Sequence, residues 1–269
     1  MKRKLILAFV FLFAIALFTG CKSDVSREES SQSETKLDTT VIDNILERGY
    51  LTVGCSEEST SLFEYDEKNG KYSGLEADIA YETAAEIFGV TAEKAEKDGL
   101  VEFVPVTSEN RESLVLWGNF DVLLANYTIT SERKQTLSFS DSYYTDYLAV
   151  LVSKESKLSN VSDLTNKNVG VVRSTTSEDN LKTYFSSLEK NKDYPFFFEY
   201  ADLDAAVAAL KDNVVSAVCC DENLISEYAV DGYELLDEKV VGQHYGAAVK
   251  PENELLLDYV NTSIAKCIK

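Results

Sequence analysis

The chain has 269 residues, 45% of them hydrophobic, and a formal net charge of −20 at pH 7. This composition is that of a globular protein, and its acidity argues against nucleic acid as a partner, because Lys and Arg side chains supply most of that affinity. Five cysteines without paired CxxC spacing and a single histidine, His244, argue against a structural zinc site, and no cofactor is expected.

The first 20 residues predict a signal peptide. Lys2, Arg3 and Lys4 precede an apolar run over residues 5–18, which is too short to cross a bilayer. Thr19 and Gly20 then place Cys21 in a context that resembles the cleavage site of bacterial lipoproteins, although Phe18 replaces the usual aliphatic residue. We therefore expect Cys21 to be acylated, as by palmitate; the alternative is an ordinary thiol after a plain secretory signal.

A flexible tether is expected over residues 21–40, because this stretch is nearly all polar and has too little apolar surface to order itself. The predicted signal peptide holds three basic and no acidic side chains, so 23 basic residues face 46 acidic ones after it, a net charge of −23. We attribute this acidity to solubility at a cell surface.

The first half of the body alternates predicted strands and helices. Gly49 and Gly89 end two of the helices, and Asn69-Gly70 predicts a hairpin turn. The helices are expected over residues 41–48, 74–89 and 110–117, with a short helix over 131–136. The strands are expected over residues 51–55, 100–104, 122–125 and 147–153.

The second half repeats this alternation. Its strands are expected over residues 169–172, 196–200, 214–220 and 245–249, and its helices over 177–188, 203–211 and 255–268. Such alternation predicts an α/β fold with a mostly parallel sheet covered on both faces. We expect two lobes, residues 41–150 plus 245–269 and residues 151–244, with two strands connecting them.

Charged and hydroxyl side chains follow several of the predicted strands. Arg111 and Arg133 carry planar guanidinium groups that suit a carboxylate, and Asp221 ends a strand where it could hold an ammonium group. Ligands of such folds bind beyond the carboxyl ends of the strands. The alternative from residue type alone is that both arginines are surface residues paired with the abundant acids.

Several segments closely resemble the polar-amino-acid family of bacterial solute-binding proteins, the receptors of ABC importers. They occur in the family's order over almost the whole chain after the predicted signal peptide: residues 74–80, 103–111, 120–133, 139–144, 169–171, 174–178 and 245–250. The resemblance implies a two-lobed, periplasmic-binding-protein-like (type II) fold with two crossover strands, and closure of the lobes on a small amino acid.

The resemblance also implies site residues. Arg133 would bind the α-carboxylate of the ligand, Asp221 its α-ammonium group, and Arg111 a side-chain carboxylate. The remaining ligand-binding residues that it implies are Thr128, Thr175, the backbone of Thr176, the carbonyl of Asn126, and Ser56, which stands where some receptors for acidic amino acids have a lysine. We therefore expect aspartate or glutamate as ligand, with glutamine and cystine as alternatives.

Further expectations follow from the resemblance. The partners would be an amino acid, the membrane permease of an ABC importer and, through the lipid anchor, the cell membrane, and the protein would be a monomer outside the cytoplasm. We expect no enzymatic activity, because His244 has no evident nucleophile beside it. A dehydratase-like enzyme and a surface sensor on the same scaffold are the rival hypotheses.

The four cysteines after Cys21 are expected to be mostly buried small apolar residues. Trp117 is expected to pack below the cleft.

Overall fold

The structure is a computed structural model that describes residues 39–188 and 193–268. These residues all belong to one compact unit. The predicted signal peptide, Cys21 and all but the end of the predicted tether lie outside the described residues, and Thr40, the last tether residue, is the first residue of helix α1 (Thr40–Arg48). Among the residues that the structure describes, no helix is long and apolar enough to cross a membrane.

The first lobe is built on strands in the order β4-β1-β5-β11, followed by β6. Strands β1, β4 and β5 pair in parallel, and β2 and β3 form a separate hairpin at Asn69-Gly70. Besides α1, its elements are β1 (Leu51–Ser56), β2 (Glu64–Asp66), β3 (Lys71–Ser73), α2 (Leu75–Phe88), α3 (Ala92–Lys97), β4 (Val101–Val106), α4 (Arg111–Trp117), β5 (Val122–Leu124), η1 (Arg133–Gln135) and α8 (Glu254–Cys267).

The second lobe is built on strands in the order β6-β9-β7-β8, with β10 also paired to β6. Strand β7 pairs in parallel with β8 and β9. Its elements are η2 (Val161–Leu164), β7 (Asn168–Val172), α5 (Ser177–Ser187), β8 (Phe196–Tyr200), α6 (Leu203–Lys211), β9 (Ala217–Asp221), α7 (Glu222–Ile225), η3 (Ser226–Tyr228) and β10 (Tyr233–Leu235).

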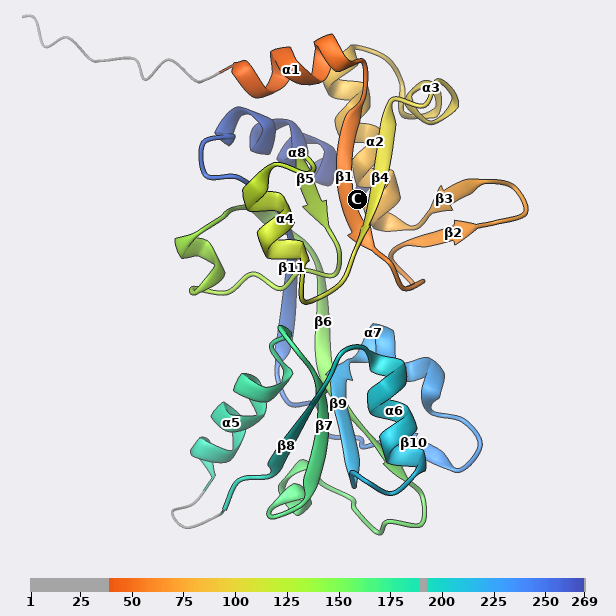
Figure 1. Ribbon diagram of the computed structural model, residues 1–269, viewed down its shortest axis with the longest axis vertical. Coiled ribbons are helices and arrows are strands. Elements are labelled where there is room, and N and C mark those ends of the chain that lie inside the picture. Colours follow the sequence, from red (N-terminus) through yellow and green to blue (C-terminus); the bar gives the residue numbers. More distant parts are fainter. Residues whose placement is uncertain (1–38, 189–192, 269) are drawn as a thin grey trace, which may run out of the picture. The chain divides into compact units, whose positions relative to one another are not determined.

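Two antiparallel strands connect the lobes, β6 (Ser138–Ser153) and β11 (Gly242–Val249) (Figure 1). The first part of β6 pairs with β11, whereas its last part pairs with β9 and β10. The expected lobe boundaries, at residues 150/151 and 244/245, fall inside these two strands. Their exact positions stay a prediction.

Each lobe has a hydrophobic core on both faces of its sheet, because helices cover both faces. In the first lobe, α1, α2 and α8 cover one core and α4 the other. In the second lobe, α5 covers one face and α6 the other. Cys219 and Cys220 are buried in the two cores of the second lobe, and Cys55 is buried with Phe63 and Ala77 in a separate small cluster of the first lobe. Cys267 is partly buried, and all four are free thiols, which agrees with their expected role as small apolar residues.

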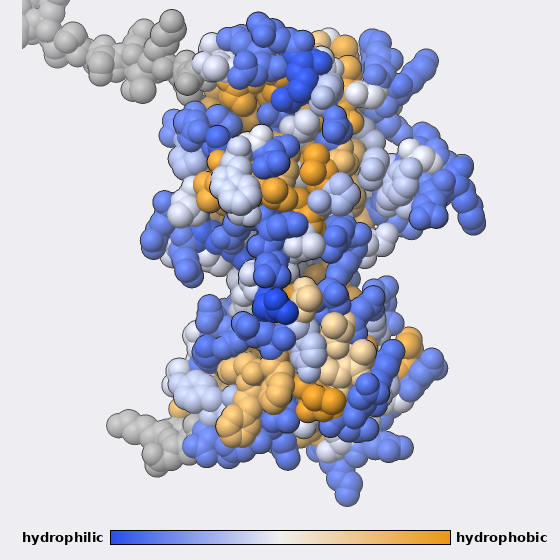
Figure 2. All heavy atoms as spheres, in the orientation of Figure 1, coloured by the Kyte–Doolittle hydropathy of each residue, from blue (hydrophilic) through white to orange (hydrophobic). Residues whose placement is uncertain are grey.

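The elements expected from periodicity are present, with differences where burial depends on distant partners. Strand β6 begins at Ser138 rather than residue 147, because its first part alternates polar and apolar residues against β11. The short elements α3, α7 and β10 were missed. The expectation that Trp117 is packed was wrong: its side chain is 76% exposed at the end of α4. The face in Figure 2 is otherwise mostly hydrophilic, with separate apolar patches, as expected for so acidic a chain.

Gly74 gives a first testable prediction. It precedes α2 with φ 102° and ψ 168°, a conformation essentially restricted to glycine. A Cβ atom there would lie 2.4 Å from the carbonyl oxygen of Leu62, which accepts the N–H of Glu76. We expect Gly74→Ala to lower the free energy of unfolding, measured by urea denaturation, by more than the roughly 1–3 kcal/mol of backbone strain alone.

Gly89 provides the matched control. It also has positive φ, at 66°, but a Cβ atom there meets nothing within 4 Å. Gly89→Ala should therefore cost only about 1 kcal/mol. Equal losses in the two variants would contradict the proposed clash with Leu62.

Candidate functional site

All eight predicted site residues line one cavity between the lobes. The centres of water-sized spheres can occupy about 70 Å³ inside it. On this measure about 10–15 Å³ is enough for one water molecule. The cavity can therefore hold a small molecule. The predicted residues in its wall are Ser56, Arg111, Asn126, Thr128, Arg133, Thr175, Thr176 and Asp221.

The topology explains why these residues meet. Ser56 ends β1, Asn126 follows β5 by two residues, and Asp221 ends β9. The carboxyl ends of parallel strands lie at the same edge of a sheet, and the cavity brings the edges of the two lobes together. The site therefore uses the ends of strands from both lobes.

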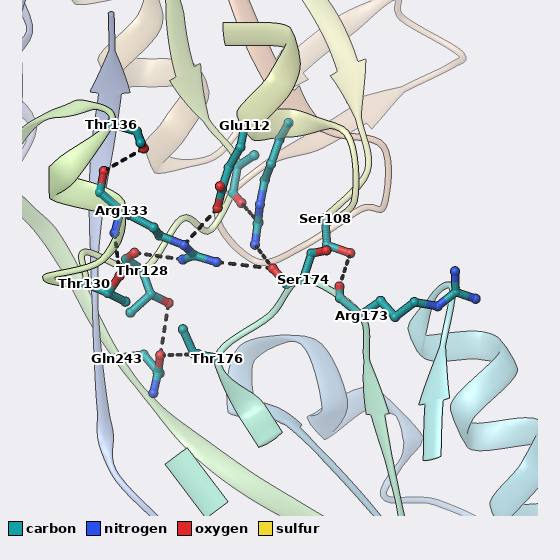
Figure 3. Close-up of polar contacts among 12 residues, drawn as sticks. Ser108, Glu112, Thr128, Thr130, Arg133, Thr136, Arg173, Ser174, Thr176 and Gln243 are labelled. Atoms are coloured by element: carbon teal, nitrogen blue, oxygen red, sulfur yellow. Dashed lines mark hydrogen bonds and ion pairs between the residues drawn. The ribbon is translucent and has the colours of Figure 1, made fainter. Parts of the chain in front are cut away.

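Two arginines, Arg133 and Arg111, converge on one point of the second lobe, and Figure 3 shows the contact of Arg133 with Ser174. The guanidinium of Arg133 donates to the carbonyl of Ser174 over 3.2 Å, and that of Arg111 donates to the same oxygen over 3.5 Å. Both also stack on the ring of Tyr127, with their central carbons 4.1 Å and 4.7 Å from its centroid. This end of the cavity is consequently strongly positive.

Burial lowers the pKa of Arg111 to about 10, and the neighbouring charge of Arg133 lowers it too. Arg111 nevertheless stays charged at neutral pH. Its Nη1 donates to the carbonyl of Ala125 over 2.9 Å, whereas its buried Nε has no partner among the described residues. Such a concentration of positive charge suits an anionic group.

The protein uses three of the five N–H groups of Arg133. They donate to Glu112 over 3.2 Å, to the carbonyl of Thr128 over 2.8 Å and to that of Ser174. Because a guanidinium has five N–H groups, two remain for a ligand. The three protein contacts fix the plane in which those two groups can point.

The predicted hydroxyl groups lie in the cavity but donate within the protein. Thr128 and Thr176 both donate to Oε1 of Gln243, over 3.0 Å and 2.8 Å, so a residue of crossover strand β11 connects the two lobes (Figure 3). Thr175 donates to the carbonyl of Val172 in its own loop. These hydroxyls thus offer lone pairs, and they would have to rotate to donate to a ligand carboxylate.

Asn126 is held by residues from two directions. Its backbone N–H donates over 2.8 Å to the fully buried Glu76, which also accepts from the hydroxyl of Tyr143. Burial raises the pKa of Glu76, although these two hydrogen bonds lower it. The side chain of Asn126 accepts from Asn223 of the second lobe over 3.0 Å. Asn126 therefore joins the lobes at the cavity wall.

Asp221 is one of the acidic residues that line the cavity. Its carboxylate accepts from the hydroxyl of Tyr245 on β11 over 2.7 Å. Burial raises the pKa of Asp221 to about 6; the nearby charge of Asp146 also raises it, whereas Tyr245, Arg111 and Arg133 lower it. A buried carboxylate of this kind suits a cationic group of a ligand.

Sequence reasoning missed several residues of this site. Tyr127 and Ser174 stand inside segments already singled out, so their positions in the motifs were a usable signal. Glu76 and Tyr245 also stand inside such segments. Nothing local in the sequence indicates the others: Asp146, Asn223 and Gln243, together with the acids Glu57, Glu58 and Asp202 that line the cavity.

Metal binding finds no support in the described part of the chain, where no group of three or more His, Cys, Asp or Glu side chains could hold an ion. His244 is exposed on β11, and its Nδ1 lies 3.1 Å from the hydroxyl of Thr145. It does not line the cavity.

The fold and the cavity define a class: two-lobed binding proteins with a type II periplasmic-binding-protein-like fold and two crossover strands. Residues 51–269 match the bacterial extracellular solute-binding proteins, family 3, and the chain belongs to this family. The resemblance stated from the motifs is thereby confirmed.

Two curated relatives illustrate the family. The chain is 30% identical to the ABC transporter glutamine-binding protein GlnH of Bacillus subtilis over 99% of this chain and 92% of the relative. It is 26% identical to a glutamate/aspartate import solute-binding protein of Escherichia coli over 84% of this chain and 74% of the relative.

Two solved structures agree with the fold. An arginine-bound Gly52Ala mutant of the arginine-binding protein of T. maritima matches with a TM-score of 0.70 and 27% identity, over 84% of this chain and 99% of that one. An ancestral amino acid-binding protein, described as a precursor of cyclohexadienyl dehydratase, matches with a TM-score of 0.68 and 27% identity, over 84% and 92% of the two chains. The protein is thus an amino-acid-binding receptor of the kind that serves ABC importers.

Proposed function

We propose that the cavity binds the α-amino and α-carboxyl groups of one free amino acid between Arg133 and Asp221. The observation that carries this proposal is that the first lobe supplies a guanidinium and the second lobe a carboxylate to one small cavity. A zwitterion satisfies both charges at once. Arg133 and Asp221 belong to different lobes.

The same arrangement couples binding to closure. Each charge-assisted hydrogen bond contributes about 1.5–3 kcal/mol, and several are needed to offset the cost of immobilising the ligand. Because the charged groups belong to different lobes, the ligand binds the closed form better and shifts the population toward it. The closed form is the state that a permease would recognise.

Arg111 supports an oxygen-bearing ligand side chain. Two arginines on one tyrosine ring provide more positive charge than one α-carboxylate needs, so aspartate or glutamate is the ligand that we propose first. Glutamine is the second candidate, because the cavity wall also contains the acids Glu57, Glu58 and Asp202, which repel a second carboxylate but not a carboxamide. The glutamine-binding relative supports this second candidate.

We further propose that the protein is held at the outer face of the cell membrane by acylated Cys21, acts as a monomer and does not turn its ligand over. The lipoprotein-like sequence at Cys21 supports the anchor. The position of His244 outside the cavity supports binding without catalysis. Measuring the mass of the protein extracted from its native membrane tests the anchor, because diacylation and signal cleavage change it together.

A calorimetric panel at pH 7 tests the proposed ligand class. We expect L-aspartate, L-glutamate or L-glutamine to bind with micromolar or lower Kd, and L-arginine to give no heat, because its cationic end would meet Arg111. The control is 2-oxoglutarate, which keeps both carboxylates of glutamate but lacks the ammonium group for Asp221. Binding of none of the amino acids, or equal binding of 2-oxoglutarate and glutamate, would contradict the proposal.

A further inference from the structure

A buried carboxylate lies behind the partly buried Asp221. Asp146 of crossover strand β6 is only 5% exposed and does not line the cavity. Its carboxylate accepts from the backbone N–H groups of Tyr147, over 2.8 Å, and Asn223, over 3.0 Å. It is also 3.1 Å from the hydroxyl of Tyr245, the same hydroxyl that lies 2.7 Å from Asp221.

One hydroxyl therefore serves two carboxylates. A tyrosine carries a single O–H hydrogen, so it can donate to Asp221 or to Asp146 but not fully to both. Two carboxylates that share one donor in a buried place repel each other, and this repulsion favours retention of a proton.

The pair lacks an ion-pair partner. Among the described residues, 39–188 and 193–268, no ion pair includes Asp146 or Asp221. Arg111 and Arg133 act on Asp221 only through space. Buried charges without a partner are costly, so the pair has an unmet requirement for a positive group. Asp221, which faces the cavity, is where such a group can approach.

We propose that Asp146 is a positioning residue of the ammonium site: through the hydroxyl of Tyr245 it makes Asp221 part of a carboxylate pair that the ammonium group of the ligand neutralises. This inference rests on the proposed function. As the ammonium group binds with its three hydrogens, the proton held on the carboxyl of Asp221 passes to solvent. No bond other than this O–H bond breaks.

The groups that face Asp221 set the pH at which this exchange occurs. They are Asp146 on β6, Tyr245 on β11, Arg111 on α4, Arg133 on η1 and Cys220 on its own strand, with Glu57, Glu58 and Asp202 in the same cavity wall. The pKa of Asp221 is raised to about 6, chiefly by burial, and the charge of Asp146 contributes to this rise. The charge of Asp146 therefore moves the pH dependence of binding toward neutral pH.

The affinity for the ammonium group should rise with pH. Above pH 6 Asp221 is ionised and ready for the ammonium group, whereas below pH 6 it must lose a proton first. Because each pKa unit corresponds to a factor of ten, the affinity of the wild type should fall by about tenfold between pH 7 and pH 5. About half a proton should leave per ligand bound at pH 6.

Calorimetry in two buffers of different ionisation enthalpy measures this proton release. L-Glutamine and L-glutamate are titrated at pH 5, 6 and 7 into the wild type, Asp146→Asn and Asp146→Glu; glutamine is the cleaner probe, since its side chain does not titrate in this range. Asp141→Asn, an exposed position on the same strand, is the matched control. We expect Asp146→Asn to release fewer protons at pH 6 and to weaken by less than the roughly tenfold of the wild type from pH 7 to pH 5, and Asp146→Glu and the control to behave like the wild type.

The outcomes separate the inference from the proposed function. A wild type that binds no amino acid at pH 7 contradicts the proposed function, and with it the inference. A wild type that binds at pH 7 but releases no proton at pH 6, or Asp146→Asn with an unchanged pH dependence, contradicts the inference alone. If Asp146→Asn does not melt cooperatively, the number of protons that the wild type releases per ligand bound at pH 6 tests the inference instead.

Discussion

Arg133→Lys is expected to weaken amino acid binding by at least about 100-fold. Lysine keeps the charge but loses the planar fork, and two charge-assisted hydrogen bonds to a carboxylate contribute about 3–6 kcal/mol together. Arg133 also stacks on Tyr127 and donates to Thr128 and Ser174. We therefore also expect a lower melting temperature, because a lysine cannot replace these contacts. Calorimetry at pH 7 and a thermal melt of the ligand-free protein measure the two effects.

Arg173→Lys is the matched control. Arg173 lies next to Ser174, but its side chain is 43% exposed and pairs only with the exposed Glu109, over 3.5 Å. Such surface pairs contribute little, so this variant should bind within about threefold of the wild type. If Arg133→Lys behaved in the same way, Arg133 would not be the carboxylate site, and Arg111 would be the next residue to test.

Asp221→Asn is expected to abolish binding and at the same time to stabilise the ligand-free protein at pH 7. The substitution removes the charge that attracts the ammonium group, so binding should weaken by at least about 100-fold. It also removes a buried carboxylate that lies near Asp146, while Tyr245 can still donate to the amide oxygen. Function and stability should therefore change in opposite directions.

The effect of the Asp221 carboxylate on the stability of the ligand-free protein depends on pH. The pKa of Asp221 is about 6 in the folded protein and 3.8 without the environment of the fold. Between these values the folded protein binds more protons, so its stability falls as the pH rises and the full penalty applies above pH 6. Removing the charge should raise the melting temperature at pH 7 by several degrees and have little effect near pH 4.

Asp212→Asn, at an exposed position after α6 in the same lobe, controls for the loss of one negative charge. It should change neither binding nor the melting temperature. A lower melting temperature of Asp221→Asn at pH 7 would show that the carboxylate stabilises the empty protein, and would contradict the account of an unpaired buried charge.

Much of the fold follows from local patterns. Glycines after α1 and α2, the turn at Asn69-Gly70 and the periodicity of the helices predicted elements that the structure contains. The predictions were wrong where the burial of a residue depends on a partner far away in the sequence. The polar first part of β6 becomes a strand because β11 pairs with it. Trp117 is exposed because none of the described elements covers the end of α4.

The sequence by itself determined the chemistry at the strand ends: Arg111, Arg133 and Asp221 follow strands, and their residue types already suit a zwitterion. Only the tertiary structure decided which groups surround them. Tyr245, Gln243 and Asp146 reach the site because β11 lies beside β6 and β6 lies beside β9, with Gln243 opposite Asp146 and Leu148 opposite Asp221. Pairing between segments about 100 residues apart leaves no local pattern, since each strand would have the same composition in another register.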